Sequence, residues 1–116
     1  MYYILPLTND SFQVFTMDLS LVSSSLHARV ELRYLFAPNC WTISVRDNSS
    51  GELLINQIPL ICSYGEINNL FLPFRYLRDG QGLGSLFVIR AVDEPSTPDP
   101  AERNLTEFRI LWGDGA

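Results

Sequence analysis

Residues 41–60 limit the fold more than any other part of the sequence, because they predict both strands of a β-hairpin. Trp41, Ile43 and Val45 alternate with polar residues, which is typical of a strand with one buried face. Turn-forming residues follow at 47–52, where Gly51 can adopt a positive φ. The chain then returns as a strand over 53–61, and Pro59 indicates that this strand ends there or lies at a sheet edge. The hairpin predicts an architecture and does not indicate an activity.

Further strands are predicted at residues 2–7, 12–19, 26–34, 85–92 and 105–113. Residues 26–34 show the most regular alternation, with apolar side chains on one face and charged ones on the other. We expect residues 85–92, which are strongly apolar, to be buried on both faces. Residues 79–84 predict a flexible turn, and residues 93–104, with three prolines, predict an exposed loop. The sequence therefore predicts one domain over residues 1–116, an antiparallel β-sandwich or partly open β-barrel of about seven strands.

The composition is that of a folded chain, with 47% hydrophobic and 18% charged residues among 116. A chain of this length buries roughly two-thirds of the surface it exposes when unfolded, so it does not require disulfide bonds. Its net charge of −5 disfavours binding to nucleic acid and to anionic membranes. The first ten residues lack the basic region of a signal peptide, and no apolar run approaches 18 residues. We therefore expect synthesis in a cytoplasm and no membrane anchor.

Two features of residue usage leave alternatives open. All eight basic residues are arginine, which is enriched at protein interfaces where lysine is depleted, although chance in a short chain would give the same result. Cys40 and Cys62 are the two cysteines, and their spacing does not match a metal site. We expect two reduced, partly buried thiols, with a disulfide between the two strand ends as the alternative.

The sequence offers little for catalysis, and we predict no catalytic, cofactor-binding or metal-binding residues. His27 is the single histidine, and it falls on the polar face of a predicted strand. The glycines of residues 79–84 are not followed by the Gly-Lys-Ser or Gly-Lys-Thr of a phosphate-binding loop. Trp41 and Trp112 lie on the apolar faces of their strands, which favours burial over a carbohydrate-binding platform.

Aromatic and charged residues in two segments are candidates for a protein interface. The first segment is residues 71–78. Pro73 excludes a central strand there, so these residues form either an exposed docking patch or a loop that covers the core. The second segment is the loop at 93–104. The candidate interface residues are Phe71, Phe74, Arg75, Tyr76, Arg78, Asp93, Glu94 and Arg103.

The strand patterns in this order resemble the baseplate plug family of tailed bacteriophages, known from a contractile-tailed cyanophage. The likeness lies in Ile4-Leu5-Pro6-Leu7-Thr8, Phe12-x-Val14-Phe15, Leu32-x-Tyr34, Trp41-x-Ile43-x-Val45-x-Asp47, Gly51-x-x-Leu54, Ile58-Pro59-Leu60-Ile61, Asn69-Leu70 and Phe108-x-Ile110-Leu111-Trp112. The family usually has a glycine before the Pro-Leu pair, whereas this chain has Asn56-Gln57-Ile58.

The resemblance implies a structural virion protein of the tail baseplate that is not an enzyme and needs no cofactor. It further implies packing at the centre of the baseplate against hub and tube proteins, with several copies around the tail axis. We expect the segments 71–78 and 93–104 to contact neighbouring subunits. The alternative is a stand-alone ligand- or carbohydrate-binding β-sandwich module.

Overall fold

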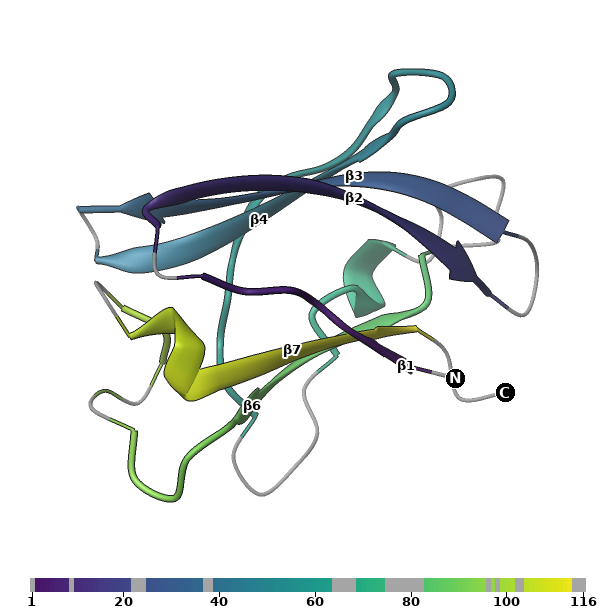
Figure 1. The fold of residues 1–116 in the computed structure, drawn as a ribbon. Helices are drawn as coiled ribbons and strands as arrows, with labels where there is room; N and C mark the ends of the chain where they lie inside the picture. The colour runs from purple at the N-terminus through teal and green to yellow at the C-terminus, as the bar shows by residue number, and fades with distance from the viewer. Residues whose placement is uncertain are drawn as a thin grey trace.

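The computed structural model describes residues 2–8, 10–21, 25–36, 39–63, 69–74, 83–95, 97, 99–101 and 104–113. Within these residues seven strands form two antiparallel sheets that face each other (Figure 1). One sheet has the order β2-β3-β4-β5 and the other the order β1-β7-β6. The strands are β1 (Tyr2–Ile4), β2 (Phe12–Ser20), β3 (Ser25–Leu35), β4 (Cys40–Asp47), β5 (Leu53–Pro59), β6 (Ser85–Arg90) and β7 (Phe108–Gly113). The predicted all-β, sandwich-like fold is confirmed.

The four-stranded sheet follows the alternation of the sequence. On β3, Leu26, Ala28, Val30 and Leu32 are buried, while His27 and Arg29 are exposed. The neighbouring strands β2 and β4 pair with β3 along most of its length, from Phe12↔Arg33 to Ser20↔Ser25 and from Ala28↔Asp47 to Leu35↔Cys40. A one-residue slip would turn these apolar side chains to solvent, so the pattern fixes the register.

The β4–β5 hairpin has the predicted turn and an irregular return strand. Gly51 adopts a φ of 79°, and its N–H donates to the Asp47 carbonyl over 2.7 Å. The register then shifts twice, and Gln57 adopts a φ of 48°, in the left-handed region that favours glycine. The first of the two shifts and the left-handed residue lie in the Asn56-Gln57-Ile58 segment. As predicted, Pro59 ends β5, which is an edge strand.

The three-stranded sheet differs from the sequence prediction in the burial of β6 and in its strand bounds, since β1 ends at Ile4 and β6 at Arg90. Leu86 and Val88 of β6 are fully buried, but Phe87 and Ile89 are half-buried because successive side chains of a strand point to opposite faces and these two lie on the outer face of the sheet. The prediction of burial on both faces was therefore wrong for the outer face. The last predicted strand begins later than expected, because residues Leu105–Glu107 form a 3-10 turn, η2, before β7.

The inner faces of the two sheets meet in one cluster of buried apolar side chains. Trp41 and Trp112 are fully buried in it, so neither indole can present a face to a sugar ring, as the sequence predicted. Each indole N–H still finds an acceptor, Trp41 at the Ala101 carbonyl over 2.8 Å and Trp112 at the Leu83 carbonyl over 2.7 Å. Cys40 is half-buried and Cys62 is buried, and the two do not form a disulfide with each other.

Candidate protein interface

The first predicted interface segment is held on β6 by the side chain of Asn69. Its amide oxygen accepts the N–H groups of Phe71 and Leu86 over 3.0 and 3.1 Å, and its amide nitrogen donates to Ser85 Oγ over 3.1 Å. The Leu70 N–H also donates to the Leu86 carbonyl over 2.9 Å. Pro73 has no N–H and cannot pair as a strand residue would. The bonds of Asn69 and Leu70 take the place of strand pairing and hold this segment against β6.

Phe71 belongs to the core and not to an exposed patch. Its side chain is 1% exposed and lies edge-on to the ring of Trp112, with 5.4 Å between ring centroids. For Phe71 the docking-patch interpretation was therefore wrong, because the backbone bonds to Asn69 allow the loop to be buried. In the 3-10 turn η1 (Leu72–Phe74), Phe74 is half-buried against the core and Leu72 is 51% exposed. Arg75, Tyr76 and Arg78 lie outside the described residues, as do residues 79–82 of the predicted turn.

The second segment, the loop at 93–104, is exposed at its start and anchored at its end. Asp93 and Glu94 are exposed, and the Arg90 guanidinium donates to the Asp93 carbonyl over 3.1 Å. Pro100, Ala101 and Asn104 are buried, which corrects the prediction of a fully exposed loop. Arg103 lies outside the described residues.

Three polar contacts explain why the second half of this loop is buried. The Trp41 indole N–H reaches the Ala101 carbonyl, and Asp99 Oδ1 accepts the Cys62 N–H over 2.8 Å. Asn104 Oδ1 accepts the Ala101 N–H over 2.7 Å. Because these contacts pair both backbone groups of Ala101, the loop packs against the sandwich without leaving them buried and unbonded.

The anchored loop forms one wall of a surface hollow of about 380 Å³. Thr97, Asp99, Pro100 and Ala101 line it from the loop, and the end of β5 with the start of β4 supplies the opposite wall. Ile61, which is 43% exposed, and the half-buried thiol of Cys40 belong to that second wall. No local sequence pattern predicts this hollow, because three distant segments form it.

The described parts of the two predicted segments lie apart from each other. In Figure 1 the green-to-yellow chain that carries the 93–104 loop lies at the left end of the sandwich, whereas the teal-green turn η1 lies toward the right. They are therefore two separate candidate contacts.

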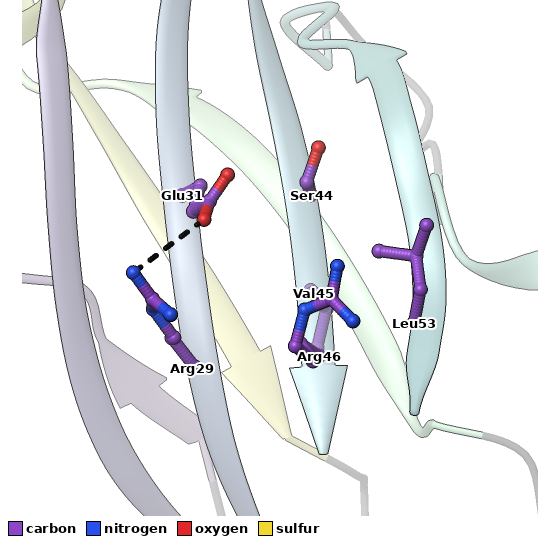
Figure 2. A pocket seen from close by; sticks show the side chains of 6 residues that line it. All are labelled: Arg29, Glu31, Ser44, Val45, Arg46 and Leu53. Carbon is purple, nitrogen blue, oxygen red and sulfur yellow. Dashed lines mark ion pairs between the residues drawn. The ribbon is translucent and has the colours of Figure 1, made fainter. Parts of the chain in front are cut away.

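A further polar region on the outer face of the four-stranded sheet was not singled out from the sequence (Figure 2). On β3, Arg29 Nη2 lies 3.8 Å from Glu31 Oε1 of the same strand. Arg29 is also paired in register with Arg46 on β4. Arg46 donates to the Gly51 carbonyl over 2.6 Å, and Leu53 of β5 lies beside it. The hollow between them has a volume of about 10 Å³, enough for a water molecule but not for a substrate.

In the part of the chain that the structure describes, no group of three or more His, Cys, Asp or Glu side chains is arranged to hold a metal ion. His27 contacts the Asp18 carboxylate on the exposed face of the β2–β3 pair. Every buried side-chain nitrogen and oxygen among the described residues has a hydrogen-bond partner. None of the helical turns in these residues has the length and apolar character that crossing a bilayer requires.

Residues 1–115 match a protein-family model described as "Cyanophage baseplate Pam3 plug gp18". No curated protein matches the chain.

Proposed function

The chain belongs to the family of cyanophage baseplate plugs, and on that basis we propose that it packs at the centre of the tail baseplate against hub and tube proteins and against copies of itself. Membership makes it a structural baseplate component with a place in the virion tail. The family match over residues 1–115 is the observation that carries this proposal.

The proposed role is mechanical and not enzymatic. The protein would close the lumen or brace the hub until the tail contracts, after synthesis in the host cytoplasm. Among the described residues every buried polar side-chain atom has a hydrogen-bond partner, and the 93–104 loop is bonded to the core through Trp41, so the fold is rigid, as a load-bearing role requires.

We assign the contacts with neighbouring proteins to the two candidate segments. The first offers the exposed Leu72 and the half-buried Phe74, with the arginines and tyrosine of residues 75–78 next to them in sequence. The second offers the exposed carboxylates of Asp93 and Glu94, with Arg103 near the end of the same loop. Apolar side chains flanked by charges are the usual composition of such contacts.

Purified phage particles provide the test of this placement. We expect mass spectrometry to detect the chain in intact particles, and chemical cross-linking to connect its 93–104 loop to the hub or tube protein. Absence of the chain from purified particles would contradict the proposal. Glycan binding by the isolated monomer, together with that absence, would support the ligand-binding alternative.

A charge-matched pair of variants tests the loop contact. Glu94→Gln removes an exposed carboxylate inside the proposed contact, whereas Glu52→Gln removes one at the tip of the β4–β5 hairpin. We expect Glu94→Gln to lower the number of copies per particle by roughly a factor of three, the range for one partly exposed ion pair. Equal incorporation of both variants would remove Glu94 from the interface.

A further inference from the structure

No described strand pairs with the outer edge of β2, which has nine residues and lies at one side of the four-stranded sheet. The Tyr34 N–H donates to the Ser11 carbonyl, so in this antiparallel ladder the odd-numbered residues from 11 onward turn their backbone groups toward β3. The even-numbered residues of β2 therefore turn theirs outward. The Ser20 N–H agrees with this assignment, because it donates to the hydroxyl of Tyr3 and not to β3.

The outward backbone groups of Val14, Thr16 and Asp18 form no hydrogen bond within the described part of the chain. An open row of N–H and C=O groups is a template for another strand. The sequence Phe12–Met17 adds to this tendency, since it has high β-propensity and neither charge nor proline. Phe12 and Val14 also expose 46% and 40% of their surface on the outer face.

The other sheet edges are protected. The edge of β6 is covered by the returning chain, whose Ser63 and Leu70 N–H groups donate to the Val88 and Leu86 carbonyls. β5 has two register shifts and ends at Pro59, and β1 has three residues. Short, bulged and proline-ended edges resist pairing, so among the described strands β2 alone offers a long regular edge.

A groove of about 350 Å³ lies beside the first half of β2, lined by Pro6, Thr8, Asp10 and residues 12–15. The side chain of Gln13, which is 9% exposed, fixes the far wall of this groove. It accepts the Thr8 N–H over 3.0 Å and donates to the Thr8 and Asp10 carbonyls over 2.6 and 3.0 Å. The groove is thus held open next to the unpaired edge.

We propose that the free edge of β2 accepts an extended strand from a different baseplate protein, which adds a fifth strand to the sheet and places its inward side chains in this groove. This inference rests on the proposed function. A phage tail has distinct head and tip ends, so copies around its axis are related by rotation and meet through two different surfaces. A second copy would have to supply another sheet edge, and those edges are protected. The strand therefore comes from another polypeptide.

The side chains around β2 define the chemistry of that strand. Its inward positions are apolar, because they cover the half-buried Phe15 and Met17. On the outer face the guanidinium of Arg33 lies 4.7 Å from the centre of the Phe12 ring and forms no ion pair with a described residue. A carboxylate on the added strand beside Phe12 would form an ion pair with the Arg33 guanidinium. This is recognition by strand addition, in which backbone bonds supply affinity and alternate side chains supply specificity.

Two variants of Thr16 test the backbone contact in the assembled phage. Thr16→Pro removes an N–H that bonds to nothing within the described chain, at an edge position where proline is tolerated, whereas Thr16→Val keeps the N–H and the β-branched shape. We expect Thr16→Pro to lower the copies per particle by about tenfold, the factor for one unmade interfacial hydrogen bond, and Thr16→Val to match the wild type. Equal incorporation of both variants would overturn the inference.

A photo-cross-linker identifies the occupant even if Thr16→Pro impairs folding. Thr16→p-benzoylphenylalanine is compared with the same substitution at Glu52, both in irradiated particles. We expect position 16 to cross-link to an extended segment of a different baseplate protein. Cross-linking to a second copy, or none with the chain present, would overturn this inference alone, whereas wild-type particles lacking the chain would overturn the proposed function as well.

Discussion

Gly84 and Gly51 provide a matched test of how closely the chain just before β6 approaches the end of β7. Both glycines have a positive φ, 76° at Gly84 and 79° at Gly51. A Cβ at Gly51 would meet no atom within 4 Å, whereas a Cβ at Gly84 would lie 2.4 Å from the Gly113 carbonyl oxygen and 3.2 Å from Leu21 Cδ2. Substitution by alanine therefore imposes similar backbone strain at both positions but a backbone collision only at Gly84.

The magnitudes separate the two variants clearly. A left-handed alanine lowers the unfolding free energy by about 1–2 kcal/mol, whereas the reduced entropy of the unfolded chain raises it by about 0.4–1 kcal/mol. Gly51→Ala should therefore lower the unfolding free energy by roughly 0.5–1 kcal/mol. At Gly84 the Gly113 carbonyl at the end of β7 must also move, at the cost of overpacking, about 1–3 kcal/mol. We expect Gly84→Ala to lose about 2–4 kcal/mol in total.

Urea unfolding followed by tryptophan fluorescence measures both losses, because Trp41 and Trp112 are buried and become exposed on unfolding. With a slope of about 2 kcal/mol per molar urea, the midpoint should fall by about 1–2 M for Gly84→Ala and by less than about 0.5 M for Gly51→Ala. Equal midpoints would show that the chain at Gly84 and Gly113 relaxes freely, which would refute the close approach of β6 and β7 at this point.

Three further changes test the conformation of the edge strand and the packing of the loops. Gln57→Gly should raise the unfolding free energy by about 0.5 kcal/mol, since relief of left-handed strain exceeds the entropic cost of glycine; an unchanged or lower value in urea unfolding would contradict the φ of 48°. Trp41→Phe should lower the unfolding free energy by about 2 kcal/mol and speed protease cleavage within the 93–104 loop, because the Ala101 carbonyl loses its hydrogen-bond donor. Unchanged cleavage would argue against this anchor. Phe71→Ala should cost about 3–5 kcal/mol and Leu72→Ala less than about 1 kcal/mol by thermal unfolding, and similar losses would contradict the burial of Phe71.

The sequence predicted those parts of the fold that local alternation controls. On β3, Leu26 to Leu32 are buried at every second position because the side-chain period of a strand is two, and the register with β2 and β4 follows from it. The positive φ of Gly51 was also predictable from local sequence, since a hairpin turn needs a residue that tolerates positive φ. Pro59 likewise marked the end of an edge strand through its missing N–H.

The candidate interface was less predictable because its residues are positioned by distant partners. Phe71 is buried since Asn69 bonds the backbone of β6, a strand that begins at residue 85. The 93–104 loop is anchored by Trp41, 60 positions before Ala101 in the chain. Neither contact leaves a periodic pattern in the sequence, so proline-rich and aromatic segments looked more exposed than they are. The open edge of β2 was also not predicted, because the residues of one strand do not show which other strands pair with it.

The anchoring of these loops bears on how such a protein could hold an assembly together. Binding through a mobile loop costs about 0.5–1.5 kcal/mol for each rotamer-rich side chain that becomes ordered. Here the Trp41 indole holds the carbonyl of Ala101, and the Asn69 side chain holds the N–H of Phe71, before any partner is present, so part of that ordering cost is met during folding. Differences in affinity among related interfaces lie mostly in the dissociation rate, and pre-ordered surfaces lower it. Under the proposed function the protein stays in place until contraction, which requires slow dissociation more than fast binding, and surface loops that are ordered by the core favour slow dissociation.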